Sequence, residues 1–172
     1  RNVSDRNIQD RRSKVQVCCP PGGILHDYVP FYFNARSPML YRIKHNPADF
    51  GNVMQSELIY LTTTAEAVTA RGLPYVFTDG HAAMAFSIFY NDIVNLPKID
   101  WDVIKGRMWI DTDEFPDRRR RRQAEFLIYL NAPWDIFDLI GVYDLQTKNE
   151  VEQILASHSH KPHVAVKSGW YY

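Results

Sequence analysis

The chain has 172 residues, of which 20 are Lys or Arg and 20 are Asp or Glu, so its formal net charge is zero. A hydrophobic content of 45% excludes an intrinsically disordered chain, and the length suits one domain with a sizeable core. With no overall positive charge, any affinity for nucleic acid has to come from local clusters of basic residues. No apolar run reaches the roughly 20 residues of a membrane span, so no membrane association is expected.

The two cysteines, Cys18 and Cys19, are neighbours in the sequence. Adjacent cysteines do not make a disulfide framework and do not have the spacing of a zinc site. We therefore expect a cytoplasmic protein, in a reducing compartment, that holds no metal. The sequence also lacks a P-loop and a GxGxxG fingerprint, which excludes the commonest nucleotide-binding motifs.

Short strands and short helices alternate along the chain, and capping residues and prolines mark their boundaries. Thr63 and Glu66 have the spacing of a capping box, and Asp100 is a typical N-cap. Pro133 suits the first turn of a helix, whereas Pro30 indicates a strand at a sheet edge or a bulge. In chain order the predicted elements are a helix at 5–14, strands at 28–33, 39–43 and 58–62, a helix at 63–71, a strand at 75–78, helices at 81–96 and 101–105, a strand at 126–130, a helix at 133–140, a strand at 141–145, a helix at 148–157 and a strand at 164–167. This mixture predicts the α+β class with sheet at the centre.

Glu125 stands at the charged end of the segment QAEFLIYL, residues 123–130. In a strand its side chain shares one face with Leu127 and Tyr129. One interpretation is a carboxylate at the mouth of the strand, solvated or paired with an arginine. The other is a carboxylate at the rim of a cleft, where it stabilises a cation or accepts a hydrogen bond from a hydroxyl group. The strand pattern leaves both interpretations open.

Five consecutive arginines, Arg118–Arg122, form the strongest cluster of positive charge. On a helix they cannot all face one partner, but two or three could contact phosphates. The alternative is a solvated face whose charge is offset by the acidic residues that precede it, Asp111, Asp113, Glu114 and Asp117.

Other polar positions suit ligands but are not specific alone. Arg11 and Arg12 belong to a charged helix surface. Arg36 and Ser37 lie in a turn before a proline, where a guanidinium suits a phosphate or a carboxylate. His81 follows a Thr-Asp-Gly turn and either caps a helix or contacts a ligand.

Four segments are more specific together than any of them is alone. They are IQDRR at 8–12, HDYVPFYFNARSPMLY at 26–41, VFTDGHA at 76–82 and RRQAEFLIY at 121–129. In order and approximate spacing they resemble the DarT family of DNA ADP-ribosyltransferases. The terminal GWYY, at 169–172, is similar to the usual ending of that family. The resemblance extends over essentially the whole chain.

The resemblance implies an ADP-ribosyltransferase fold, in which a split central β-sheet and short helices surround a cleft for the co-substrate NAD. Glu125 in QAEF matches the catalytic glutamate of the family. Arg11, the first arginine of IQDRR, matches the arginine required for reaction. The residues that match the lining of the nucleotide cleft are Tyr32, Arg36, Ser37 and Met39. The residues in segments that contact the DNA substrate are His81, Arg121 and Arg122.

The implied activity is ADP-ribosylation of a base, thymine, in single-stranded DNA, by a toxin whose partner is a macrodomain antitoxin. Because the motifs belong to the shared scaffold, guanine or RNA as the target stays open, and so does a catalytically inactive nucleic-acid-binding module. Family members begin with a strand that carries a histidine in a motif similar to YHITH, which helps to hold NAD. This chain has no such motif, so we expect one ADP-ribosyltransferase domain over 1–172 that lacks the family's N-terminal strand.

Overall fold

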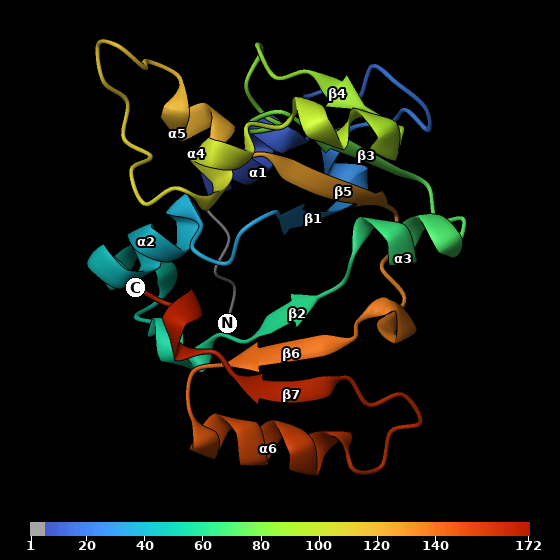
Figure 1. The fold of residues 1–172 in the computed structure, drawn as a ribbon, viewed down its shortest axis with the longest axis vertical. Helices are drawn as coiled ribbons and strands as arrows, with labels where there is room; N and C mark the ends of the chain where they lie inside the picture. Colours follow the sequence, from blue (N-terminus) through green and yellow to red (C-terminus); the bar gives the residue numbers. More distant parts are fainter. Residues whose placement is uncertain (1–5) are drawn as a thin grey trace. The chain divides into compact units, whose positions relative to one another are not determined.

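The computed structural model describes residues 6–172, so Asp5, the first residue of the expected N-terminal helix, lies outside the described part. The chain divides into two compact units, each with its own β-sheet (Figure 1). The four-stranded unit contains the described residues up to Pro38 and the segment Gly72–Ala132. The three-stranded unit contains Met39–Arg71 and Pro133–Tyr172. Two sheets accompanied by short helices confirm the predicted α+β, split-sheet fold.

The strand β5, Glu125–Tyr129, lies inside the sheet of the four-stranded unit. It pairs with β1 (Tyr28–Tyr32) on one side and with β3 (Tyr75–Thr78) on the other, and β4 (Phe89–Tyr90) extends the sheet beyond β3. All three pairings are antiparallel. The first four residues of β5 are buried. Pro30 lies in the outer strand β1, where its missing N–H is tolerated, so the predicted edge position is confirmed.

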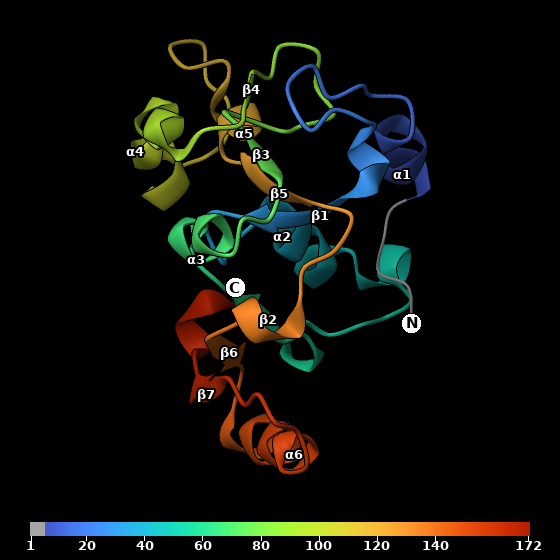
Figure 2. The ribbon, with the colours of Figure 1, turned by 90° about the vertical axis from the view of Figure 1, so that its right-hand side faces the viewer.

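Three short helices belong to the same unit: α1 (Arg6–Arg12), α4 (Trp101–Lys105) and α5 (Arg118–Arg121). α4 begins where the sequence predicts, because the Asp100 side chain accepts a hydrogen bond from the Val103 amide at 3.0 Å. α4 and α5 are in contact and lie close together in Figure 2.

The helix predicted at 81–96 is wrong, because these residues form turns, the strand β4 and a 3-10 helix at Ile93–Lys98. The Asp79 side chain accepts a hydrogen bond from the Ile88 amide at 2.9 Å. This bond closes residues 79–88 into a loop and returns the chain to pair with β3. A side chain that satisfies a backbone amide in this way competes with helix formation.

In the three-stranded unit, β6 (Leu139–Val142) lies between β2 (Tyr60–Thr62) and β7 (His163–Val166). β6 is antiparallel to β2 and parallel to β7. α6 (Leu145–Leu155) connects the two parallel strands and packs along β7 (Figure 1), since parallel neighbours require a crossover connection. One buried hydrophobic cluster of this unit consists of Ile140, Val142, Leu155 and Val164.

The strand predicted at 39–43 is wrong, because this segment lies in the helix α2, Pro38–His45. Leu40 and Ile43 are buried and the residues between them are exposed, which is the spacing of one helix face. Pro38 begins the helix with a backbone angle already suited to it. The buried apolar residues of this segment therefore follow the period of a helix and not that of a strand.

Other elements also differ from the prediction. The helix predicted at 133–140 is a 3-10 turn at Trp134–Ile136 followed by β6, whose apolar residues pair with both neighbouring strands. The N-cap of α3 (Ala65–Ala70) is Thr64, whose hydroxyl accepts a hydrogen bond from the backbone amide three residues later at 3.1 Å. The longest of the described helices, α6, has 11 residues, and no helix within 6–172 is long and apolar enough to cross a membrane.

Gly141 in β6 provides a test of the packing in the three-stranded unit. A methyl group on its Cα would lie 2.5 Å from the ring carbon Cζ3 of Trp170. We expect Gly141→Ala to lower the free energy of unfolding by about 1–3 kcal/mol, measured by urea denaturation, because overpacking forces neighbours to shift. Gly169→Ala is the control, since nothing lies within 4 Å there. Equal losses for the two variants would contradict the packing described.

Candidate active site

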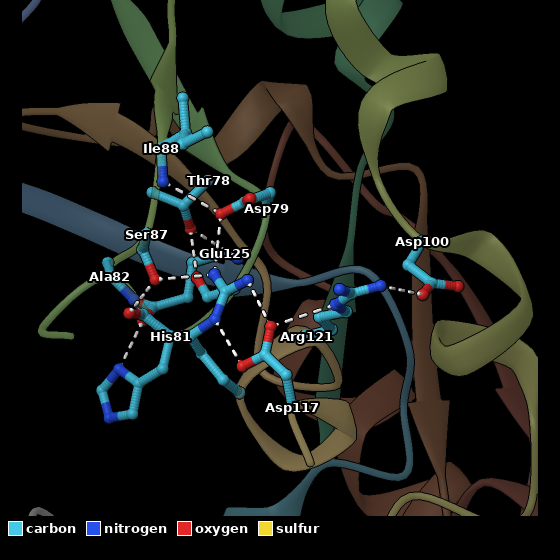
Figure 3. A network of polar contacts seen from close by, with 12 residues as sticks. Thr78, Asp79, His81, Ala82, Ser87, Ile88, Asp100, Asp117, Arg121 and Glu125 are labelled. Carbon is cyan, nitrogen blue, oxygen red and sulfur yellow. Dashed lines mark hydrogen bonds and ion pairs between the residues drawn. The ribbon is translucent and has the colours of Figure 1, made fainter. Parts of the chain in front are cut away.

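Two segments of the four-stranded unit converge on the carboxylate of Glu125, the first residue of β5. Arg12, at the end of α1, donates from Nη1 to Oε2 of Glu125 at 2.7 Å. The backbone amide of Ala82 donates to Oε1 at 3.1 Å, and Nδ1 of His81 lies 3.4 Å from the same oxygen (Figure 3). Glu125 is only 3% exposed. The carboxylate is therefore enclosed by positive and hydrogen-bond-donating groups.

The surroundings of Glu125 act on its pKa in opposite directions. Burial raises the pKa, because it disfavours the charged form. The hydrogen bond with His81 and the charge and hydrogen bond of Arg12 lower it, and together they hold the pKa below its ordinary value. The buried side chain is consequently a carboxylate, not a carboxylic acid, at neutral pH. Without such partners a buried charge of this kind would be very costly.

The imidazole of His81 faces two groups through the same nitrogen. Nδ1 lies 3.4 Å from Oε1 of Glu125 and 3.3 Å from the amide nitrogen of Ala83, which donates to it. An imidazole nitrogen either carries a hydrogen and donates, or has a lone pair and accepts, but not both. Nδ1 of His81 therefore donates to the Glu125 carboxylate when it carries a hydrogen, and accepts from the Ala83 amide when it does not.

Thr78, at the end of β3, fixes the start of β5. Its hydroxyl donates to the carbonyl of Gly80 at 2.6 Å and accepts from the amide of Glu125 at 3.2 Å. Thr78 is fully buried, so neither bond competes with water. One hydroxyl thus joins the turn after β3 to the residue that carries the carboxylate.

Tyr32 lies directly across the β1–β5 pairing from Glu125. Burial of its hydroxyl and then the negative charge of Glu125 raise the pKa of Tyr32, so the phenol stays neutral. The residue as a whole is 39% exposed. A neutral hydroxyl beside an ionised carboxylate, on a ring that reaches the surface, places Tyr32 at the edge of this group.

The arginine beside Glu125 is Arg12, whereas the sequence prediction named Arg11. Arg11 is exposed and Arg12 is 6% exposed. Consecutive helical residues point about 100° apart, so the two side chains cannot serve the same partner. The sequence held one signal for this choice: Arg12 lies four residues after the apolar Ile8 and therefore shares its helix face.

The residues predicted to line the nucleotide cleft do not form one described group. Tyr32, Arg36 and Ser37 lie in the four-stranded unit, but Met39 belongs to the three-stranded unit and is 40% exposed. Ser37 is buried. The carbonyl of Arg36 accepts a hydrogen bond from Arg122 at 3.0 Å, which holds the turn after β1 in place.

Arg122, which the resemblance places in a segment that contacts DNA, has internal partners in this structure. Arg122 is 5% exposed. Its Nη1 donates to the carbonyls of Val103 at 2.9 Å and Gly106 at 3.0 Å, and also to that of Ile104. These are the carbonyls at the C-terminal end of α4, which have no partner within the helix. A phosphate would have to displace all of these bonds.

The remaining arginines of the run differ from one another. Arg121 pairs with Asp100 at 3.0 Å and with Asp117 at 3.1 Å, and its side chain is 47% exposed. Arg118 lies 4.1 Å over the ring of Phe115. Arg119 is exposed. Within the described residues, no three side chains of His, Cys, Asp or Glu are grouped so that they could hold a metal ion.

Removal of Arg122 tests its internal role. We expect Arg122→Ala to lower the free energy of unfolding by about 3 kcal/mol, because several buried carbonyls lose their donor. The matched variant Arg121→Ala removes two ion pairs of a side chain that is 47% exposed, and is expected to cost about 1 kcal/mol or less. Urea denaturation followed by circular dichroism measures both. A small, equal loss in the two variants would contradict the internal role.

Comparison with known proteins gives consistent matches over the full length. The family described as ssDNA thymidine ADP-ribosyltransferase, DarT, matches residues 1–172. A DNA ADP-ribosyl transferase of Thermus sp. (strain 2.9) is 39% identical over 174 residues, which cover 100% of this chain and 81% of the relative. The corresponding protein of Escherichia coli O127:H6 is 32% identical over 171 residues, covering 99% of this chain and 78% of the relative.

Solved structures agree with the sequence matches. Thermus sp. 2.9 DarT in complex with ADP-ribosylated ssDNA is similar with a TM-score of 0.93 at 38% identity, covering 100% of this chain and 81% of that one. The same Thermus protein in complex with NAD+ gives a TM-score of 0.87 at 38% identity, covering 94% of this chain and 81% of that one.

Proposed function

Because the chain belongs to the DarT family of ssDNA ADP-ribosyltransferases, we propose that it transfers ADP-ribose from NAD to thymine, with Glu125 and Arg12 at the reaction centre. NAD-dependent ADP-ribosylation of single-stranded DNA is the activity of this family. The observation that carries the assignment of residues is the buried, ionised carboxylate of Glu125, held by Arg12 at 2.7 Å.

Glu125 stabilises the positive charge that develops on the NAD ribose. As the bond between ribose and nicotinamide breaks, nicotinamide leaves with the electron pair and the ribose becomes oxocarbenium-like. A carboxylate close to such a sugar stabilises it, as in glycoside hydrolysis. The carboxylate also accepts a hydrogen bond from a ribose hydroxyl, which fixes the ring. The depressed pKa matters here, because only the ionised form has the required charge.

Arg12 changes its partner during the reaction. In the structure it covers the Glu125 carboxylate, so a ribose that binds there has to replace one of the existing contacts. The released guanidinium then donates to a carbonyl oxygen of thymine and stabilises the negative charge on the base. Arg12 does not take the proton itself, because a guanidinium stays protonated in proteins. The base nitrogen releases its proton to solvent and uses the freed electron pair to form the new bond to the ribose carbon that nicotinamide leaves.

The substrate strand is single because pairing hides the nitrogen that reacts. His81 and Arg121 are the DNA contacts retained from the sequence prediction: His81 lies beside Glu125, and Arg121 is partly exposed. Of the residues predicted to bind NAD we retain Tyr32, which is paired directly with Glu125 on the neighbouring strand β1.

The biological setting is likewise our proposal. A toxin with a macrodomain antitoxin as its partner is supported by membership of the DarT family. A cytoplasmic location is supported by the two cysteines, which are both free. Free thiols are ordinary in a reducing compartment.

Mass spectrometry of oligonucleotides incubated with NAD tests the activity and the role of Glu125 together. We expect one ADP-ribose on single-stranded oligonucleotides that contain thymine, and none on RNA or on DNA without thymine. Glu125→Gln should bind NAD and DNA but react at least about a hundredfold more slowly, because the preorganised charge is lost. Transfer by Glu125→Gln at the parent rate would refute its role, and modification of guanine or RNA would refute the choice of thymine.

Two adjacent arginines provide a matched test of Arg12. We expect Arg12→Gln to lower kcat by about a hundredfold, because the contact with the developing negative charge is removed. Arg11→Gln changes an exposed side chain on another face of the same helix and should keep kcat within about twofold of the parent. Steady-state transfer assays on the two variants decide between them. A large loss for Arg11→Gln with normal activity of Arg12→Gln would reverse the assignment.

A further inference from the structure

Arg120 ties together the loop that delivers His81 and Ala82 to Glu125. Its Nη1 donates to Oδ1 of Asp79 at 2.9 Å, and Asp79 lies at the start of this loop. The same Nη1 donates to the hydroxyl of Ser87 at 3.2 Å, near the end of the loop. One guanidinium nitrogen therefore bridges the two ends of residues 79–88.

The backbone of His81 is held from both sides by the same arrangement. Its amide donates to the carbonyl of Arg120 at 3.0 Å. Its carbonyl accepts from the hydroxyl of Ser87 at 2.7 Å (Figure 3). The next amide along the chain, that of Ala82, is the one that donates to Glu125. Arg120 therefore affects the Glu125 carboxylate through two consecutive residues, His81 and Ala82.

Arg120 is itself fixed by Asp117. Nε and Nη2 of Arg120 donate to Oδ1 and Oδ2 of Asp117, each at 2.8 Å, which is a bidentate pairing. The hydrogen bond from Arg120 is the largest influence on Asp117 and holds the pKa of that carboxyl below its ordinary value. The Arg120 side chain is only 12% exposed, and its charge is shared by two carboxylates, so it is poorly suited to hold a phosphate.

Gly80 is packed closely against Arg120, so that a larger residue at position 80 would force the Arg120 side chain to shift. A Cβ at this position would lie 2.9 Å from Cγ of Arg120, and closer still to its guanidinium. The turn before His81 and the arginine therefore have fixed positions relative to each other.

We propose that Arg120 is a positioning residue for the transfer reaction, which holds the turn at 79–82 so that the Ala82 amide and His81 meet the Glu125 carboxylate. The proposal rests on the proposed function of Glu125. It assigns the third arginine of the run to the geometry of the reaction centre and not to the DNA surface.

Amide hydrogen exchange measured by NMR tests the positioning without any catalysis. In Arg120→Gln, we expect the Ala82 amide to exchange at least about tenfold faster than in the parent, because its hydrogen bond with Glu125 is no longer held. The amide of Val76, in the neighbouring strand β3, should change by less than about twofold. If Arg120 only stabilised the fold, Arg120→Gln would accelerate hydrogen exchange of both amides equally. Arg71→Ala is the control variant, since it removes an arginine–aspartate pair of 2.6 Å in the three-stranded unit.

Transfer kinetics give the second readout. We expect Arg120→Gln to lower kcat by about tenfold with KM for NAD within about twofold, and Arg120→Lys to fall between Gln and the parent, because Lys is a point charge without the bidentate fork. Calorimetric titration with NAD gives the fraction of binding-competent protein, so that kcat is stated per site. A full activity of Arg120→Gln, or a full rescue by Lys, would overturn the proposal.

Gly80→Ala closes a double-mutant cycle with Arg120→Ala. We expect Gly80→Ala alone to lower kcat by about tenfold, because the added methyl group displaces Arg120. In the Arg120→Ala background the same change should cost under about twofold, since the obstructing side chain is gone. Additive losses would contradict the contact.

The two proposals can fail separately. If Glu125→Gln is fully active but Arg120→Gln accelerates exchange of the Ala82 amide, the function proposed for Glu125 fails and the positioning role of Arg120 stands. If Glu125→Gln is inactive but exchange of the Ala82 amide is unchanged in Arg120→Gln, only the positioning role of Arg120 fails.

Discussion

The ion pair between Arg12 and Glu125 joins the first helix of the described chain to the first residue of the inner strand β5. A carboxylate that is 3% exposed stays ionised only if other groups replace the water it has lost. Arg12, the Ala82 amide and His81 are those groups. The same contacts surround the carboxylate, so under the proposed function a ribose that binds to Glu125 has to replace one of them.

The five arginines at 118–122 show how similar residues acquire different roles from the phase of one short helix. Arg122 binds the carbonyls at the end of α4, Arg120 bridges Asp79 and Asp117, and Arg121 reaches Asp100 at the surface. Asp117, the last of the acidic residues that precede the run, is therefore a specific partner of Arg120 and Arg121. Composition alone does not distinguish which of the five have partners inside the protein.

The sequence predicted the features that depend on local signals. The strands β1, β3 and β5, the cap at Asp100 and the edge position of Pro30 follow from alternation, capping and the missing N–H of proline. The resemblance to a family singled out Glu125 as a candidate site residue. The resemblance did not distinguish Arg11 from Arg12, because adjacent identical residues differ only in the helix face on which they lie. That face becomes visible in the partial burial of Ile8.

The parts that the sequence did not predict depend on contacts between distant segments. Residues 81–96 have helical apolar spacing, but Asp79 captures the Ile88 amide and turns the chain back to β3. Arg122 has the composition of a DNA contact, but carbonyls of α4, at least 16 residues away in sequence, occupy its guanidinium. Neither partner can be identified before the fold is known.

An NMR titration of the side-chain carboxyl carbon of Glu125 measures its charge state directly. We expect a pKa below the ordinary value of 4.5 in the parent protein, and a higher pKa in Arg12→Gln, where burial remains but the neighbouring positive charge is lost. A pKa at or above the ordinary value in the parent, or one unchanged by Arg12→Gln, would show that Arg12 does not keep the buried carboxylate ionised.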